Sequence, residues 1–270
     1  MTRGISRSHP RYESLRIREL LMSGYRAGIV TTSGLIAHGR GEAFDYLMGE
    51  KTIEPAAKAT RAAAAALILA KTPVISVNGN SASLVPSELV RLSELSSAPL
   101  EVNLFHPSEK RKRLIRELLE RVGAKRILGV GDYRSVEISD IASARREADI
   151  LGINDADVVM VPLEDGDRTE SLVKRGKKVI AIDLNPLSRT ARYASITIVD
   201  NISRALPNLI GSVDKIKKMK RDEISRILSR FSNTDNLRLC TKSIQERLIR
   251  IADGDSDYFE EDLSDVGAGR

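Results

Sequence analysis

Residues 156–199, ADVVMVPLEDGDRTESLVKRGKKVIAIDLNPLSRTARYASITIV, decide the fold of this chain of 270 residues. The stretch contains three short aliphatic runs, at Ala156–Val161, Lys178–Ile182 and Ile196–Val199. Segments that fit amphipathic helices separate them, at Asp167–Arg175 and Ser188–Ala194. This alternation is typical of parallel strands joined by right-handed helical crossovers. It predicts an α/β fold with a doubly wound, mainly parallel, Rossmann-like sheet.

The same texture extends towards the N-terminus. Further strands are expected at Val74–Val77, Leu100–Leu104 and Arg126–Val130, and further helices at Ser87–Ser96, Ser108–Val122 and near Ser139–Ala148. The segment Glu54–Lys71 is rich in alanine and opens with a proline, so it predicts a helix ahead of the first strand. Two closing helices are expected from apolar residues at helical spacing over 216–231 and 237–251.

These elements predict one α/β domain over residues 1–252. Its parts are an N-terminal helical extension (about 1–72), the Rossmann-like part (about 73–201) and C-terminal helices (about 202–252). Residues 253–270 have no periodicity, and we expect them to be a disordered tail that catalysis does not need.

The chain has too few cysteines and histidines for two common kinds of site. Cys240 is the single cysteine, which excludes an internal disulfide framework and a cysteine-based zinc site. The histidines, His9, His38 and His106, lack metal-ligand spacing. No apolar run is long enough for a membrane span, and the N-terminus lacks an apolar signal core. These features predict a cytoplasmic protein with no membrane partner.

The formal net charge of +6 conceals an asymmetry. Residues 253–270 hold seven acids and one arginine, a net charge of −6, so the remaining chain carries +12. One interpretation is nucleic-acid binding. The other is a site for small molecules that carry several negative charges.

The segment His38-Gly39-Arg40-Gly41 precedes an expected helix start at Glu42. Glycines let a backbone approach a ligand, and the N–H groups of a helix start favour anions. Arg40 adds a planar cation that matches phosphate or carboxylate. An ordinary turn with a surface arginine explains the same residues.

Polar residues also follow the expected strands. Asn78 and Asn80 follow the first, and the segment 162–170 (PLEDGDRTE) brings Asp165 and Asp167 to the start of a helix. Those two aspartates suit Mg²⁺ or an amine, although Asp167 could merely cap the helix. Asp183 stands where ribose hydroxyls bind in such sheets. Each motif also fits a common turn, but together they predict one ligand-filled edge of the sheet.

The longer motifs carry a family resemblance. They are SHPRY (8–12), GLIAHGRGEAFDYL (34–47), TIEPA (52–56), VNGN (77–80), PLEDGDRTE (162–170), IDLNPLSR (182–189) and ITIVDN (196–201). In sequence and order they resemble the archaeal 4-phosphopantoate–β-alanine ligases, also called phosphopantothenate synthetases. The resemblance spans most of residues 8–201, and the closing helices fit it in kind. Lys125–Asn154 and the acidic tail do not match.

The resemblance implies an ATP-dependent, amide-forming ligase of coenzyme A biosynthesis. It would join the carboxylate of (R)-4-phosphopantoate to the amine of β-alanine through an acyl-adenylate, with AMP and diphosphate as products. It also implies a homodimer and a requirement for Mg²⁺, whose ligands stay open.

The resemblance assigns ATP contacts to Arg18, Arg40, Asp183, Leu184, Asn185, Arg189, Thr190, Asn201 and Ile202. We expect Asp183 and Asn185 to contact the ribose or base, and Arg18, Arg40 and Arg189 to contact phosphates. Phosphopantoate is expected at His38, Asn78, Asn80 and Arg168, with Asp165 and Asp167 near the metal or the β-alanine ammonium. The candidate catalytic residues are Arg40, His38 and Asp165, with His38, Asp165 or bulk water taking the proton.

Two other functions compete with the ligase. The basic body of the chain and the run Lys215–Arg221 would suit a nucleic-acid-binding protein, but that run lies on a helix whose other face is apolar. A nucleotide-binding regulator without catalysis would use the same strand-end motifs. The ligase is the interpretation that we favour, with no nucleic acid among its partners.

Overall fold

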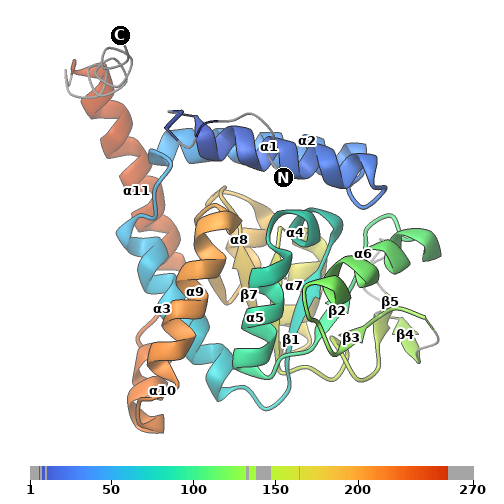
Figure 1. Cartoon of the computed structure of the whole chain (residues 1–270). Coiled ribbons are helices and arrows are strands. Elements are labelled where there is room, and N and C mark those ends of the chain that lie inside the picture. The colour runs from blue at the N-terminus through green and yellow to red at the C-terminus, as the bar shows by residue number, and fades with distance from the viewer. Residues whose placement is uncertain are drawn as a thin grey trace.

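A six-stranded, all-parallel sheet forms the centre of the molecule (Figure 1). The computed structural model describes residues 6, 8–9, 11–131, 134–137, 147–163 and 165–254. The strands lie in the order β3-β2-β1-β6-β7-β8. Their bounds are β1 Pro73–Val77, β2 Leu100–Val102, β3 Ile127–Leu128, β6 Val158–Pro162, β7 Lys178–Ile182 and β8 Ile196–Ile198. The predicted doubly wound α/β fold is confirmed.

The order in which the chain adds strands to the sheet reverses between β1 and β6. The chain adds β2 and β3 on one side of β1, then returns to add β6, β7 and β8 on the other. Ile75 of β1 is paired with Leu100 of β2 and with Met160 of β6. Ligands bind at such a switch point, beyond the carboxyl ends of the strands.

Aliphatic side chains pack against both faces of the sheet, as in buried parallel strands. Ile75 and Val77 of β1 face one hydrophobic core, whereas Val74 faces the other. Residues of α5 (Pro86–Ser96) and α6 (Glu109–Arg121) belong to the first core, and Leu172 of α7 (Gly166–Lys174) belongs to the second. The sheet is therefore held from both sides, and its carboxyl edge keeps a fixed shape.

Three N-terminal helices form the predicted extension. They are α1 Tyr12–Arg26, α2 Thr32–Met48 and α3 Glu54–Leu69. Figure 1 shows α1 and α2 crossing the top of the molecule, above α4 (Gly79–Leu84) and α8 (Arg189–Tyr193). All the alanines of α3 except Ala57 are buried, and this helix packs against α9 (Ile202–Ile216), α10 (Arg221–Ser229) and β8. A long helix, α11 (Asn233–Ala252), contacts α2 and α3.

Several element boundaries differ from the predictions. The expected helix over 216–231 is divided between α9 and α10 by residues 217–220, so three helices, not two, follow β8 within residues 199–254. Glu147–Asp149 is a strand (β5), paired antiparallel with β4 (Ser135–Glu137), where the end of a helix was expected. The rest of that expected helix, residues 139–146, lies outside the described residues, as do residues 255–270 of the acidic tail.

The segment around Arg40 also differs. Residues 38–41 lie inside α2, which begins after Thr31 and ends at Gly49, so the predicted helix start at Glu42 is wrong. Thr31 caps the helix by accepting a hydrogen bond from the Gly34 N–H, and Gly49 ends it with φ of +83°. These strong signals at both ends outweigh the weak helix propensity of the internal glycines.

Candidate active site

The carboxyl edge of the sheet holds a cavity of about 650 Å³. It lies over the switch point and is bounded by α2, the segments that follow β1, β2, β6, β7 and the start of α9. Its lining residues are Thr31, Ser33, Gly34, Ala37, His38, Arg40, Gly41, Phe44, Asn78–Asn80, Leu104–His106, Arg111, Leu163, Asp165, Gly166, Asp183–Asn185, Ser188–Thr190, Asn201 and Ile202.

Most of the predicted site residues meet in this cavity. Those that line it are His38, Arg40, Asn78, Asn80, Asp165, Asp183, Leu184, Asn185, Arg189, Thr190, Asn201 and Ile202. They come from five separate motifs, so the fold brings together what the sequence separates. Their individual ligand contacts stay predictions.

The segment after β7 is built around the Asp183 carboxylate. One carboxylate oxygen accepts a hydrogen bond from the Asn185 N–H (2.9 Å) and the other from the Ser188 hydroxyl (2.5 Å). Burial raises the pKa of Asp183, although these donors and the charge of Arg40 act against the rise. The carboxylate is therefore fixed in position, and the charge of Arg40, another lining residue, acts on it.

Two lining arginines differ in their partners. Arg40 is an exposed residue of α2, and its charge acts on Asp183. Arg189, at the start of α8, forms an ion pair with Glu170 (2.5 Å) and lies 5.7 Å from the centre of the Tyr193 ring. Both guanidinium groups stand where anionic ligands can reach them.

The two asparagines after β1 hold the edge of the cavity together. The Asn78 amide donates to the carbonyl oxygens of Pro162 (2.9 Å) and Leu163 (3.0 Å), and its oxygen caps α4. The Asn80 amide donates to the carbonyl of Gly34 in α2 (2.8 Å). Asn78 thus joins the two halves of the sheet at the switch point, and Asn80 joins α2 to α4.

His38 is buried in the wall of the cavity, with 9% of its surface exposed. Its Nε2 atom makes no hydrogen bond among the described residues. Burial lowers the pKa of His38, although Glu42 and Asp45 act against this effect. Burial therefore favours the neutral imidazole, which has one ring nitrogen that can accept a proton.

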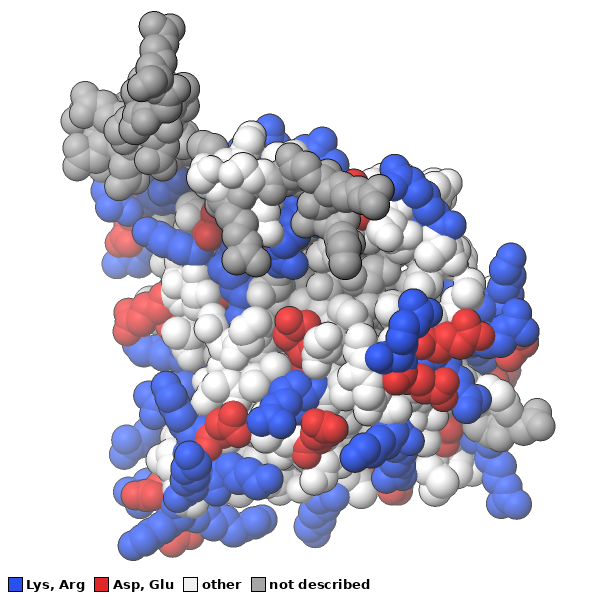
Figure 2. All heavy atoms as spheres, viewed as in Figure 1, with Lys and Arg blue, Asp and Glu red and all other residues white. Residues whose placement is uncertain are grey.

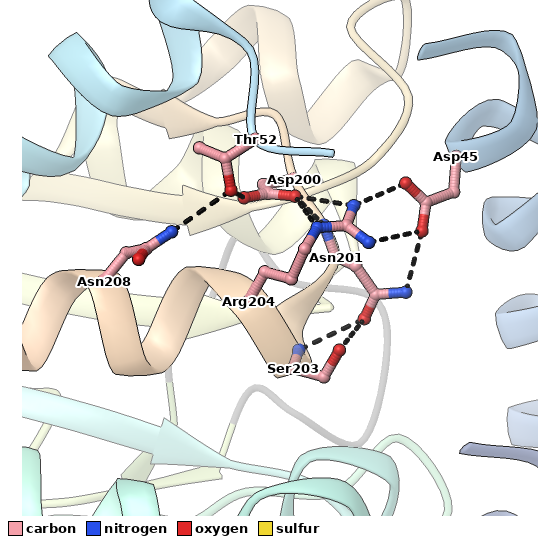
Figure 3. Close-up of polar contacts among 7 residues, drawn as sticks. All are labelled: Asp45, Thr52, Asp200, Asn201, Ser203, Arg204 and Asn208. Carbon is pink, nitrogen blue, oxygen red and sulfur yellow. Dashed lines mark hydrogen bonds and ion pairs between the residues drawn. The ribbon is translucent and has the colours of Figure 1, made fainter. Parts of the chain in front are cut away.

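A buried polar network fastens α2 to the start of α9 (Figure 3). The Arg204 guanidinium contacts Asp45 of α2 (2.5 Å) and Asp200 (2.8 Å). The amide of Asn201 donates to the same Asp45 carboxylate (3.1 Å). The hydroxyl of Thr52, from the loop before α3, donates to Asp200 (2.6 Å). The network fixes α2, which carries His38 and Arg40, relative to α9.

Removing Asp45 is expected to destabilise the fold. Asp45→Ala should lower the free energy of unfolding by about 2 kcal/mol, because Arg204 and Asn201 both lose a buried acceptor. Urea unfolding measures this change. Glu117→Ala is the matched control, since Glu117 pairs with Arg113 on an exposed helix face at 3.8 Å and should cost less than about 0.5 kcal/mol. Equal losses in the two variants would contradict a structural role for the network.

Three predicted site residues lie outside the cavity lining. Arg18 is exposed on α1, and Asp167 is half-buried on α7. Arg168 is wholly buried, and its guanidinium donates to the Ser76 hydroxyl of β1 (3.2 Å). Burial lowers its pKa to about 10, with Glu101 and Asp165 acting in the opposite direction. Arg168 is therefore not part of the cavity lining, and its contact with phosphopantoate stays a prediction.

Sequence reasoning missed the residues that follow β2. Leu104–His106 and Arg111 line the cavity, but no motif singled them out. Arg111 belongs to the charged run EKRKR (109–113), a pattern typical of a solvated helix face. The only available signal was position, since residues 103–106 follow an expected strand that neighbours the first one.

The surface charge does not form one continuous basic stripe on the face that Figure 2 shows. Lys and Arg gather there over the region of α10 and elsewhere alternate with Asp and Glu. In the basic run, Lys215, Lys217 and Lys218 are exposed while Ile216 is buried. The run is therefore the solvated face of a packed segment. Across the described ranges, none of the helices has both the length and the apolar composition needed to cross a bilayer.

Comparison with known proteins places the chain in one family. The family model described as phosphopantothenate/pantothenate synthetase matches residues 55–247. A protein of Thermococcus kodakarensis named 4-phosphopantoate–β-alanine ligase is 50% identical over 250 residues, covering 92% of this chain and 95% of that protein. Proteins of the same name from Methanosarcina mazei (92% and 97% coverage) and Methanospirillum hungatei (92% and 100%) are 49% and 45% identical. The chain therefore belongs to the phosphopantothenate/pantothenate synthetase family.

Proposed function

We propose that this chain is a 4-phosphopantoate–β-alanine ligase that uses ATP and releases AMP and diphosphate. The observation that carries this proposal is the convergence of the family motifs on one cavity at the switch point of the sheet. The product would be 4′-phosphopantothenate, an intermediate of coenzyme A biosynthesis. No observation favours a nucleic-acid-binding protein or a non-catalytic regulator in its place.

The first step of the proposed reaction is adenylation. A carboxylate oxygen of 4-phosphopantoate attacks the α-phosphorus of ATP, and the bond to diphosphate breaks. The carboxylate and the phosphate of 4-phosphopantoate meet the triphosphate of ATP in this step, so the repulsion between these three anionic groups must be screened. Arg40 and Arg189 line the cavity and are the cations that we assign to the phosphates. Asp183 and Asn185, fixed after β7, are assigned to the ribose or base.

In the second step, the amine of β-alanine attacks the acyl carbon, and the bond to AMP breaks. The ammonium must first lose a proton, and the amide nitrogen loses another as the bond forms. His38 is a suitable acceptor because burial favours its neutral form and its Nε2 makes no hydrogen bond among the described residues. Asp165, at the start of α7, is the alternative base or the partner of the ammonium.

We also propose Mg²⁺ as the accompanying ion. Within the residues that the structure describes, no three His, Cys, Asp or Glu side chains cluster as a protein-only metal site requires. Mg²⁺ is usually held by one or two carboxylates together with waters and substrate phosphates. Asp165 lines the cavity and fits that role. When bound, the ion would neutralise charge on the triphosphate and on the departing diphosphate.

The proposal extends to location and assembly. We place the enzyme in the cytoplasm, where its small charged substrates would be found. We also propose a homodimer. Exposed apolar side chains on α11, namely Leu239, Leu248 and Ile249, are candidates for its surface.

An isotope experiment tests both the reaction and its intermediate. The chain is incubated with ATP, Mg²⁺, β-alanine and 4-phosphopantoate labelled with ¹⁸O in its carboxylate, and the products are identified by mass spectrometry. We expect AMP that carries one ¹⁸O, formed only when both co-substrates are present, because the carboxylate oxygen stays on phosphorus. Release of ADP, or no turnover, would refute the ligase, whereas unlabelled AMP would refute the acyl-adenylate.

A further inference from the structure

Arg111 is a half-buried cation in the cavity wall that the reaction proposed above does not use. Its Nε atom donates to the carbonyl of Ile29 (2.7 Å), and its Nη1 atom donates to the carbonyl of His106 (2.9 Å). Both acceptors are neutral. The two bonds hold the guanidinium in place and leave its charge without compensation.

No carboxylate pairs with Arg111 in the described part of the chain. By comparison, Arg189 forms an ion pair with Glu170, and Arg204 forms one with Asp45. Within the described ranges, no charged neighbour affects the pKa of Arg111, which burial lowers. Removing a cation from water without a counter-ion costs free energy. A cavity that contains such a cation is suited to an anionic ligand.

Gly79 keeps the space beside Arg111 open. A Cβ atom at residue 79 would lie 2.6 Å from Nη2 of Arg111 and 2.3 Å from the carbonyl oxygen of Ile29. Gly79 and Arg111 both line the cavity. Because glycine has no side chain, it leaves the Nη2 edge of the guanidinium uncovered on this side of the cavity. Nη2 makes none of the hydrogen bonds that hold the side chain, so its protons remain available to a ligand.

The position of Arg111 separates it from the proposed nucleotide contacts. Apart from Arg40 on α2, the lining residues among those contacts follow β7 and β8, whereas the residues around Arg111 follow β1 and β2. Four strand spacings lie between β2 and β8, which is about 19 Å. The carboxylate that reacts must lie beside the α-phosphate of ATP. The opposite end of the same acid, its phosphate, would then extend towards β1 and β2.

The wall beside Arg111 is apolar. Leu104 is buried, and Phe105 is 44% exposed, with its ring edge-to-face against His106 at 4.7 Å between centroids. The backbone of phosphopantoate carries two methyl groups between its hydroxyl and its phosphate. An exposed aromatic ring next to a cation suits that sequence of groups.

We propose that Arg111 binds the phosphate of 4-phosphopantoate and thereby distinguishes this acid from the same acid without its phosphate. The inference rests on the proposed function and adds a subsite to it. A bidentate contact from Nη2 and a neighbouring guanidinium proton is the arrangement that phosphate favours.

The test compares Arg111→Gln with the full-length wild-type chain. Calorimetric titration of 4-phosphopantoate without ATP is expected to show at least a 10-fold weaker affinity in the variant, since a charge-assisted contact is lost. In steady-state assays, the ratio of kcat/KM for phosphopantoate to kcat/KM for pantoate should fall by a similar factor. The KM for ATP should change less than about 3-fold, because the ATP contacts lie at the other end of the cavity. Arg113→Gln, an exposed arginine of the same helix, should leave every value unchanged.

Arg111 also donates hydrogen bonds to two backbone carbonyl groups, so a purely structural role must be distinguished from phosphate binding. That role would impair phosphopantoate and pantoate equally and would leave their ratio unchanged. Arg111→Lys, which retains the charge, should recover part of the preference. An unchanged affinity for phosphopantoate in Arg111→Gln, or an unchanged ratio, overturns the inference while the ligase stands.

The proposed function fails separately if the wild-type chain binds phosphopantoate but forms no amide with β-alanine. The titration would still decide the role of Arg111 in that case. A wild-type chain that does not bind phosphopantoate at all overturns both proposals.

Discussion

Replacing Arg40 by alanine is expected to lower kcat/KM for amide formation about 1,000-fold, which corresponds to about 4 kcal/mol of transition-state stabilisation. Arg40 is an exposed residue of the cavity lining, and its charge acts on Asp183. After its removal, the Asp183 carboxylate still accepts hydrogen bonds from the Asn185 N–H and the Ser188 hydroxyl. The loss of kcat/KM should arise in adenylation, because the phosphoryl groups that meet in this step are no longer screened by a positioned cation. The free energy of unfolding, measured in urea, should stay within about 0.5 kcal/mol of the wild-type value.

Two further variants sharpen this result. Arg40→Lys keeps the charge but loses the planar fork, so its activity should lie between those of the wild type and Arg40→Ala. Arg61→Ala removes an exposed arginine of α3 that is not among the lining residues, and it should keep wild-type kinetics. AMP formation at varied ATP and phosphopantoate measures all three. Wild-type rates in Arg40→Ala would remove this residue from the site.

Asp183→Asn is expected to raise the KM for ATP about 100-fold, with a smaller effect on kcat. The carboxylate is held by the Asn185 N–H and the Ser188 hydroxyl, and Asp183 lines the cavity. Two charge-assisted hydrogen bonds to ribose hydroxyls, each of about 1.5 kcal/mol, give an effect of this size. Because ribose does not react, the loss belongs to binding rather than to the chemical step.

Titration with a non-hydrolysable ATP analogue separates this effect from catalysis. Its affinity should fall with the KM, while the affinity for phosphopantoate should stay within about 3-fold of the wild type. Asp222→Asn, at an exposed position of α10, is the control for the loss of one negative charge. Unchanged affinity for the analogue would place the ribose elsewhere.

The sheet could be predicted from the sequence because its strands are short, aliphatic and separated by helices. Lys178–Ile182 was predicted with the bounds that β7 has, since Gly176 and Lys177 turn the chain before it and Asp183 follows it. The carboxyl-edge site followed from the same strands, because residues after parallel strands meet at one edge. Local pattern was therefore enough where a polar motif directly follows a strand, but it missed Leu104–His106, which follow β2 without such a motif.

Residues placed by tertiary packing could not be predicted in this way. The glycines beside Arg40 indicate a turn by propensity, yet a cap at Thr31 and a left-handed residue at Gly49 carry one helix through them. Arg168 stands in a motif near the site, but its buried side chain extends from α7 to Ser76 of β1 and not to the cavity lining. The side of a helix that faces a cavity depends on packing that no short motif records.

The network between α2 and α9 also has a consequence for synthesis on the ribosome. Asp45 and Asn201 are 156 residues apart, which is about 8 to 30 s of translation at ordinary elongation rates. Throughout that interval α3 emerges without α9, the helix that covers it. Its covered positions are largely alanine, including Ala59, Ala62 and Ala66, so the waiting surface offers little apolar area to other nascent chains. Larger apolar residues at these positions would expose more apolar surface on the nascent chain. They would therefore promote aggregation before α9 is synthesised and the site is formed.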